Sequence, residues 1–147
     1  MKIVQAQIDH LRAVASLFDQ YRVFYGAASN LNAAHAFLQA RLQHGDSVIL
    51  VAQDGDRLVG FTQLYPSFSS VAMQRIWILN DLFVEPSSRN QGIAKQLLQA
   101  AEAYAKDTHA IRIVLATQIS NVLAQSLYES LGYRKDEAFY HYVLPLG

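Results

Sequence analysis

Two neighbouring stretches decide the fold: WILNDLFV, from Trp77 to Val84, and RNQGIAKQLLQA, from Arg89 to Ala100. The first is rich in apolar residues at positions of both parities, which is typical of a central strand covered on both faces. The second places Ile93 and Leu97 on one side of an amphipathic helix. A further apolar run at residues 111–116 predicts another strand. This order predicts a parallel crossover, with a ligand crevice at the carboxyl end of the first strand.

Hydrophobic spacing predicts further elements on both sides of this crossover. Helical spacing begins at about residue 9, resumes near residue 32 and returns at residues 124–131, where Gly132 ends the last helix. Apolar runs predict strands at residues 2–5, 48–52, 58–65 and 139–144, with a hairpin turn at Asp54-Gly55 and a serine-rich loop at residues 66–70. We therefore expect an α+β fold in α/β/α layers, with a twisted mixed sheet and helices on both faces.

The composition is that of one globular domain, residues 1–147. A hydrophobic fraction of 52% and a charged fraction of 16% exclude intrinsic disorder. Lys and Arg balance Asp and Glu at 12 each, so no excess charge favours nucleic acid or a membrane surface. The absence of cysteine excludes disulfides, thiolate zinc sites and a cysteine nucleophile. Because there is no signal-peptide pattern and no run long enough to span a membrane, we expect a cytoplasmic protein.

The segment Arg89–Ala94 has the features of an anion cradle at the start of a helix. A glycine at Gly92 lets backbone amides approach phosphate oxygens closely, and the positive end of the helix dipole favours their charge. Arg89 can add a charge-assisted bond. Taken alone, the segment is equally consistent with an ordinary exposed loop. A P-loop and a dinucleotide fingerprint are excluded, because both need further glycines, and the P-loop also needs Lys-Ser/Thr.

This segment resembles the acetyl-CoA site of the GNAT superfamily of N-acetyltransferases. The family signature Gln/Arg-x-x-Gly-x-Gly/Ala is matched by Arg89, Gly92 and Ala94. A second family block, Asn-x-x-Ala-x-x-Leu-Tyr-x-x-x-Gly-Phe/Tyr, is matched one strand later by residues 121–133. The pattern is most similar to small histone-and-polyamine acetyltransferase-like members. The resemblance implies a single-domain sheet of about six or seven strands, splayed between the fourth and fifth.

The resemblance also implies how acetyl-CoA, the cosubstrate, would bind. The pantetheine arm would lie in the splay, bonded by strand backbone, and the amides of residues 91–95 would hold the diphosphate. The implied cosubstrate-binding residues are Leu82, Phe83, Val84, Arg89, Asn90, Gln91, Gly92, Ile93, Ala94, Lys95, Asn121, Ala124 and Tyr128. For Asn121, a helix N-cap is an equally suitable role.

Tyr128 is the implied general acid. The departing CoA thiolate needs a proton, and a phenol with a pKa near 10 can supply it. The alternative is a core aromatic at helical spacing. For the general base, some relatives place a glutamate at the position of Ile78, which cannot serve. Asp81 can act through a water, whereas Asn80 could only orient one. The alternative for Asp81 is a structural hydrogen-bonding role.

The acceptor pocket is implied at the end of the first helix, where Tyr21, Phe24 and Tyr25 cluster, with Tyr65 as a second candidate for its wall. Aromatic faces suit a cationic amine, although aromatics at helical spacing also form ordinary core. Asp19 can pair with an amine or remain an exposed helix carboxylate. The five histidines show no metal-ligand spacing, so we expect no metal.

Two functions of different classes remain. The first is an acetyl-CoA-dependent N-acetyltransferase that acts on a small amine, a polyamine, or a protein lysine or N-terminus, by direct attack in a ternary complex. The second is a non-catalytic acyl-CoA-binding or sensing module. Ile78 in place of a glutamate is compatible with the second, whereas Tyr128 favours the first. The apolar stretch at residues 139–144 is suited to pairing in a homodimer.

Overall fold

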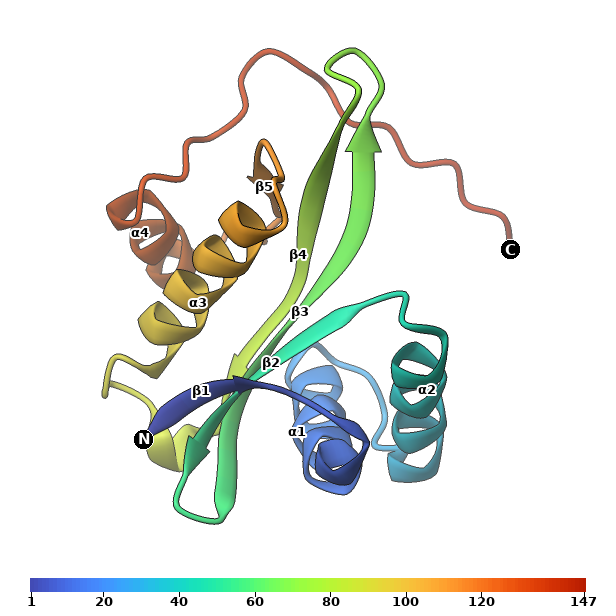
Figure 1. Ribbon diagram of the computed structural model, residues 1–147, viewed down its shortest axis with the longest axis vertical. Helices are drawn as coiled ribbons and strands as arrows, with labels where there is room; N and C mark the ends of the chain where they lie inside the picture. Colours follow the sequence, from blue (N-terminus) through green and yellow to red (C-terminus); the bar gives the residue numbers. More distant parts are fainter. The chain divides into compact units, whose positions relative to one another are not determined.

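The computed structural model describes residues 1–147 in two compact units, Met1–Ala116 and Thr117–Gly147. The first unit contains a five-stranded sheet in the order β1-β2-β3-β4-β5 (Figure 1). Its strands are β1 (Lys2–Gln5), β2 (Val48–Asp54), β3 (Arg57–Ser69), β4 (Gln74–Val84) and β5 (Ile113–Val114). The pairs from β1 to β4 are antiparallel, whereas β4 and β5 are parallel. The mixed sheet and its parallel crossover agree with the sequence prediction.

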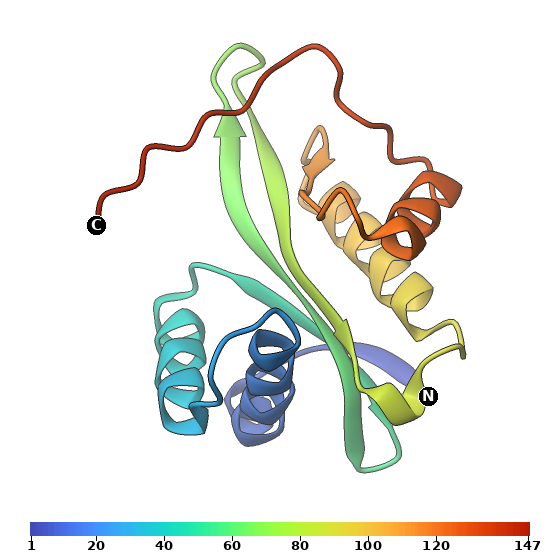
Figure 2. The same cartoon turned by 180° about the vertical axis from the view of Figure 1, so that it is seen from behind.

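Helices cover both faces of this sheet. Figures 1 and 2 show α1 (Leu11–Phe24) and α2 (Leu31–His44) on one face and α3 (Ile93–Asp107) on the other. Short 3-10 helices precede α1 (Ile8–His10) and follow β4 (Pro86–Ser88). The predicted α/β/α layers are therefore confirmed.

The main core lies between α1, α2 and the sheet. Val14 and Phe18 of α1 and Leu38 of α2 are buried against Val51 and Phe61 of the sheet. The helical residues recur at the spacing expected for one buried face of an amphipathic helix. On the opposite face, α3 buries its own apolar stripe, which consists of Ile93, Leu97, Leu98, Ala101 and Ala105.

Gly60 permits the close packing of β3 between β4 and α3. A Cβ atom at this position would lie 2.9 Å from the backbone oxygen of Phe83 and 3.3 Å from a methyl carbon of Leu97. Any larger residue would push the strand or the helix away. The glycine therefore helps to fix α3 on the sheet near the carboxyl end of β4.

The β3–β4 hairpin is longer than its hydrophobic pattern predicts. The stretch at residues 66–70 was expected to be a loop, but β3 continues to Ser69, and Pro66 pairs with Trp77 of β4. β2 pairs with β3 only as far as Leu64, so the last part of β3 has a single neighbour. Because proline is tolerated on a strand with one free edge, Pro66 does not end the strand.

The sheet has five strands, fewer than the six or seven predicted from the sequence. Residues 139–144, predicted as a strand, form none. The second unit contains no other strand, so this segment has no ladder partner there for its backbone groups. β5 is also shorter than predicted, and its pairing with β4 is limited to Trp77 and Ile78. Beyond Ile78, β4 has no partner on this side, which is the predicted splay.

The second unit consists of one helix, α4 (Val122–Ser130), and irregular segments. Gly132 follows the helix with a φ of +97°, and its amide bonds Glu129 O at 3.1 Å. This left-handed glycine ends the helix, as the sequence predicts. In the whole chain, no helix is both long enough and apolar enough to cross a bilayer.

Candidate active site

A β-bulge lies near the carboxyl end of β4. Gln63 of β3 pairs with Asp81, whereas the next residue, Leu64, pairs with Leu79. Asn80 is therefore an extra residue in β4, opposed by no single residue of β3. Such a bulge bends the strand and breaks its simple alternation of side chains between the two faces.

Because of the bulge, the side chains of Trp77 and Asp81 lie on opposite faces of the sheet. Trp77 faces α3, where its Nε1 donates to Thr108 Oγ1 at 2.9 Å. Asp81 faces α1, where it is hydrogen-bonded by Gln63 and Tyr21. Residues four apart share a face in a regular strand. The extra residue is therefore what places the carboxylate on the α1 face.

Asp81 is buried, with only 3% of its surface exposed. Gln63 Nε2 donates to Oδ2 at 2.6 Å, and Asn80 Nδ2 donates to Oδ1 at 3.1 Å. Burial raises the pKa of Asp81, and the hydrogen bonds from Gln63, Tyr21 and Asn80 partly oppose this rise. A carboxylate whose pKa is raised is a stronger base than an exposed aspartate. The hydrogen-bonding role expected for Asp81 is present, and the geometry is also suited to proton transfer.

Two tyrosines flank this carboxylate. Tyr21 of α1 hydrogen-bonds Asp81, and its hydroxyl also donates to Asn80 O at 3.4 Å. Tyr65 lies on β3, two residues beyond Gln63. Burial and the negative charge of Asp81 raise the pKa of Tyr65 to about 12. Tyr65 therefore stays neutral at physiological pH.

An aromatic cluster joins the end of α1 to β4. The ring of Tyr25 lies 5.1 Å from the rings of both Tyr21 and Phe24. Phe83 lies 6.3 Å from Tyr21 and 6.4 Å from Phe24. Tyr21 also packs on the core at Phe61, whereas Phe24 and Tyr25 are 60% and 47% exposed. The three aromatics predicted to line an acceptor pocket thus lie together, and two of them present surface to solvent.

Arg89 lies against this cluster. Its Nε donates to Val84 O at 2.9 Å, and its guanidinium carbon is 5.4 Å from the centroid of Phe24 and 5.5 Å from that of Phe83. These are cation–π contacts. In the structure this side chain ties the loop after β4 to the aromatic cluster. The bond from Arg89 to an anion, which the sequence suggests, stays a prediction.

The loop from Asn90 to Gly92 turns the chain into α3 through two left-handed residues, with φ of +62° at Asn90 and +77° at Gly92. Gly92 is the N-cap of α3 and has no side chain that could accept from the first-turn amides. The first helical bond is from Gln96 N to Gly92 O, at 3.1 Å. The amides of residues 93–95 (Ile93, Ala94 and Lys95) are the ones a helix start leaves available for an anion.

The carboxyl end of β4 has one open edge. On one side, β3 pairs with Leu82, Phe83 and Val84. On the other side, the pairing of β4 with β5 stops at Ile78. The backbone groups on the open edge can therefore bond an extended ligand as an added strand would. This edge and the start of α3 belong to the same strand–loop–helix segment, because only residues 85–92 separate them.

The remaining predicted residues lie in the second unit. Asn121 caps α4, since its Oδ1 accepts from Ala124 N at 3.2 Å. The N-cap role allowed by the sequence is thus confirmed. Tyr128 is half-buried, and its ring lies 5.8 Å from that of Tyr133.

Sequence reasoning missed Gln63, which is fully buried and bonds the Asp81 carboxylate. A signal for it existed: polar residues interrupt two otherwise apolar strands, at Thr62-Gln63 and at Asn80-Asp81. Asp19 has a structural role, because its oxygens accept from Ser29 Oγ at 2.6 Å and Asn30 N at 2.7 Å. These bonds hold the turn between α1 and α2.

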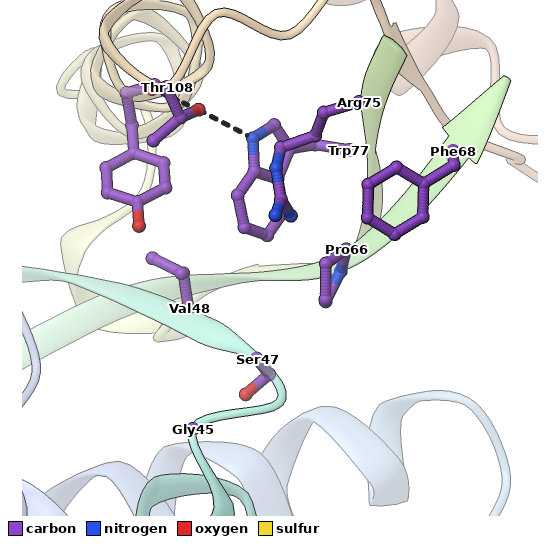
Figure 3. A pocket seen from close by; sticks show the side chains of 9 residues that line it. Gly45, Ser47, Val48, Pro66, Phe68, Arg75, Trp77 and Thr108 are labelled. Carbon is purple, nitrogen blue, oxygen red and sulfur yellow. Dashed lines mark hydrogen bonds between the residues drawn. The ribbon is translucent and has the colours of Figure 1, made fainter. Parts of the chain in front are cut away.

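A separate hollow of about 620 Å³ lies at the other end of β4 (Figure 3). It is lined by Gly45, Ser47, Val48, Pro66, Phe68, Arg75, Trp77, Tyr104 and Thr108. None of the predicted catalytic or cosubstrate-binding residues lines it. No group of three or more His, Asp or Glu side chains is arranged to hold a metal ion.

Comparison with protein families and curated sequences gives related enzymes. The model of the acetyltransferase (GNAT) family matches residues 13–133. The chain is 51% identical to the uncharacterized N-acetyltransferase YhfO of Bacillus subtilis (strain 168), over 98% of this chain and 97% of that protein. It is 32% identical to a probable acetyltransferase of Haemophilus influenzae, over 89% of this chain and 86% of that protein.

Solved structures share the fold. A crystal structure of a probable acetyltransferase aligns with a TM-score of 0.96 at 46% identity, covering 100% of this chain and 99% of that one. The aminoglycoside N-acetyltransferase AAC(6')-Iy, in complex with CoA, aligns with a TM-score of 0.81 at 23% identity, covering 99% and 95%. The second likeness is one of fold alone.

Proposed function

Since this chain belongs to the GNAT family of acetyltransferases, we propose that it transfers the acetyl group of acetyl-CoA to a primary amine by direct attack in a ternary complex. One domain, residues 1–147, would perform the reaction. The supporting observation is the arrangement along β4: a buried carboxylate at the bulge, an open strand edge next to it, and a glycine-capped helix start immediately after. An acyl-CoA-binding module would have no use for the buried base.

Acetyl-CoA, as cosubstrate, fits the residues present. Its diphosphate suits the amides of Ile93, Ala94 and Lys95, because Gly92 leaves the helix start without a side-chain cap. Its pantetheine amides suit the open edge at Leu82–Val84. AAC(6')-Iy, which shares the fold, binds CoA. Asn90, Gln91, Asn121 and Ala124 complete the proposed set from the family signatures.

Asp81 is the proposed general base. The amine nitrogen forms a bond to the thioester carbon as the carbon–sulfur bond breaks, and the amine loses a proton. Asp81 would accept this proton at Oδ1 through a water, because Oδ1 is the oxygen on the side of the exposed Asn80. Burial raises the pKa of Asp81, which makes its carboxylate a stronger base than that of an exposed aspartate.

Tyr128 is the proposed general acid, from its place in the second family signature. Its phenol would give a proton to the CoA sulfur as that sulfur leaves. Tyr128→Phe removes this proton and keeps the ring. We expect turnover to fall by about tenfold or more, with little change in the affinity for acetyl-CoA, measured by initial rates and calorimetry. A wild-type rate would assign Tyr128 a packing role only.

The acceptor is proposed to be a cationic primary amine that contacts Tyr21, Phe24 and Tyr25, with Tyr65 as a further wall. Phe24 and Tyr25 present aromatic surface to solvent, and such faces attract ammonium groups. The buried charge of Asp81 adds to this attraction. Small amines, polyamines and protein amines all have the required group.

The test is CoA thiol release from acetyl-CoA with a panel of amines: spermidine, lysine-rich peptides, free amino acids and aminoglycosides. The protein has no cysteine, so a thiol reagent gives no background from the enzyme. Turnover with one class supports the proposal and identifies the acceptor type. Bound acetyl-CoA without turnover on any member would favour a binding module.

We also propose a homodimer in which the C-terminal segment contacts a second copy. Tyr140, Tyr142 and Leu146 are 90%, 91% and 93% exposed, and three such residues in one extended segment favour burial in an interface. Light scattering after size exclusion should give twice the chain mass. The double variant Tyr140→Ser, Tyr142→Ser should then give the monomer mass, whereas a monomeric wild type would contradict the proposal.

A further inference from the structure

We propose that Gln63 is the positioning residue of the base: it holds Asp81 by Oδ2 and leaves Oδ1 to face the bulge. This inference rests on the proposed function of Asp81. Gln63 is on β3, directly opposite Asp81 in the register, and is fully buried. Its Nε2 donates to Asp81 Oδ2 at 2.6 Å, a shorter bond than the one of 3.1 Å from Asn80 Nδ2 to Oδ1.

The Asp81 carboxylate, which only accepts, fixes which way the Gln63 amide points, and Ser47 supports this orientation. Ser47 Oγ donates to Gln63 Oε1 at 2.9 Å, so the amide oxygen is held by the serine and the amide nitrogen is directed at the carboxylate. The reverse orientation would set Gln63 Oε1 against Asp81 Oδ2, which are both acceptors. The three side chains therefore form a directional chain from Ser47, before β2, through β3 to β4.

These hydrogen bonds give the two carboxylate oxygens of Asp81 different roles. Oδ2 is bonded inside the protein by a fully buried amide, where no water is needed to satisfy it. Oδ1 is bonded by Asn80, an exposed residue of the bulge. A proton relayed by water from the acceptor amine would therefore arrive at Oδ1. Gln63 prevents rotation of the carboxylate away from that position and stabilises its charged form.

Other groups face Asp81 from the surrounding elements. Tyr21 of α1 hydrogen-bonds it, and Tyr65 of β3 is close enough for its own pKa to be raised in part by the Asp81 charge. Arg41 of α2 and Asp46, which follows that helix, act on Tyr65 in opposite directions. With a pKa of about 12, Tyr65 does not titrate between pH 5 and 9. Tyr65 therefore does not contribute to a change of activity in that range.

The test is Gln63→Leu, which keeps the approximate volume and removes the donor. The hydrogen bond favours the carboxylate, so its loss raises the pKa of Asp81 further. We expect the ascending limb of kcat/KM against pH to move up by about one unit, a tenfold loss below the limb. The rate should recover toward the wild-type value at high pH, with the KM for acetyl-CoA unchanged. The amine used is the fastest member of the panel above.

Two further variants keep the test decisive. Ser47→Ala frees the amide to rotate, so it should shift the limb in the same direction by less, even where Gln63→Leu folds poorly. Thr62→Val is the matched control, because Thr62 is also fully buried and donates to the backbone oxygen of Asp81 at 2.7 Å. It should lower the melting temperature and leave the limb in place.

A 13C NMR titration of the aspartate carboxyls gives a readout that needs no acceptor. The Asp81 resonance, assigned by its loss in Asp81→Asn, should titrate at higher pH in Gln63→Leu, by the same amount as the kinetic limb. A limb unchanged in both Gln63→Leu and Ser47→Ala, with Asp81→Asn inactive, would overturn the role of Gln63 alone. Wild-type turnover in Asp81→Asn would overturn the proposed base and this inference with it.

Discussion

Two parts of β4 differ in almost every property, although they belong to one strand. We call the part around Trp77, which has a strand on each side, the closed end, and the part from Asp81 to Val84, which has a strand on one side only, the open end. At Trp77 the strand is paired on both sides, by β3 and by β5, and its side chain packs on α3. At Asp81 it is bulged, paired on one side only, and its side chain is a buried acid on the other face. The first end stabilises the fold, and the second end concentrates the groups that chemistry needs.

The difference comes from one inserted residue. In a regular strand without the bulge, Asp81 would follow Trp77 and Leu79 onto the α3 face, among apolar side chains. An ionised carboxylate would be very costly there. With the bulge at Asn80, the same residue reaches Gln63 and Tyr21, which can bond it. The bulge thus makes a buried acid compatible with the sheet, and the short β5 leaves the strand end next to it open for a ligand.

The largest effect should come from Asp81→Asn, which keeps the shape of the open end and removes the proposed base. We expect kcat to fall by about 10²-fold or more, since general base catalysis commonly contributes that much. Initial rates with saturating acetyl-CoA give the measurement. Asp56→Asn is the matched control, because it makes the same change at an exposed turn residue. Equal rates for Asp81→Asn and the control would remove the chemical distinction between the two ends.

Gly92→Leu tests the helix start that follows the open end. Gly92 has a φ of +77°, so a side chain there strains the turn and covers the first-turn amides. We expect the Kd for acetyl-CoA, measured by calorimetry, to rise at least about tenfold. Gly45→Leu is the control: Gly45 also has a positive φ, +62°, with open space around it, but it ends α2. Equal losses of affinity in the two variants would indicate a general effect on folding.

The pH dependence of stability should separate the two ends further. The pKa of Asp81 is raised in the folded state, so the folded protein binds more protons than the unfolded chain between the ordinary aspartate pKa and the raised one. Asp81 therefore reduces stability as pH rises through that window. Thermal melts should show Asp81→Asn gaining on the wild type as pH increases from 4 to 7. A constant difference in melting temperature would mean that burial does not shift this acid.

The sequence predicts more of the closed end than of the open one. Apolar residues at positions of both parities, such as Trp77 and Ile78, predict the strand, and Leu97 follows helical spacing. Local patterns therefore place both the strand and the helix. The bulge depends on pairing with β3, which no local pattern contains. The partner of Asp81 is likewise distant in sequence: Gln63 lies in a run that predicts an ordinary strand. The available signal was that polar pairs, Thr62-Gln63 and Asn80-Asp81, interrupt two apolar strands. Only the register of β3 and β4 shows that these pairs lie next to each other.

The prediction of a strand near the C-terminus was wrong for a related reason. Residues 139–144 have the composition of a strand covered on both faces, but a strand also needs a neighbour to bond. Residues 117–147 supply none within their own unit. Composition therefore predicted that the segment needs apolar contacts and a pairing partner, but not where that partner lies. In our proposal, the partner is a second copy of the chain.

The smallest effect is expected at the closed end itself. Trp77→Phe removes the bond from Nε1 to Thr108 Oγ1 and keeps an aromatic ring near Tyr104. Thr108 Oγ1 still bonds Tyr104 O at 2.9 Å and Ala105 O at 3.1 Å, so no polar group is left without a partner. The free energy of unfolding should fall by about 1–2 kcal/mol, measured by urea titration, with kcat unchanged. Ile78, Leu79 and Asn80 separate Trp77 from Asp81 on the strand. A change in kcat would therefore show that the bulge transmits a change in packing to the proposed base. The two ends would then be one coupled unit, and the positioning of Asp81 would extend from Gln63 to α3.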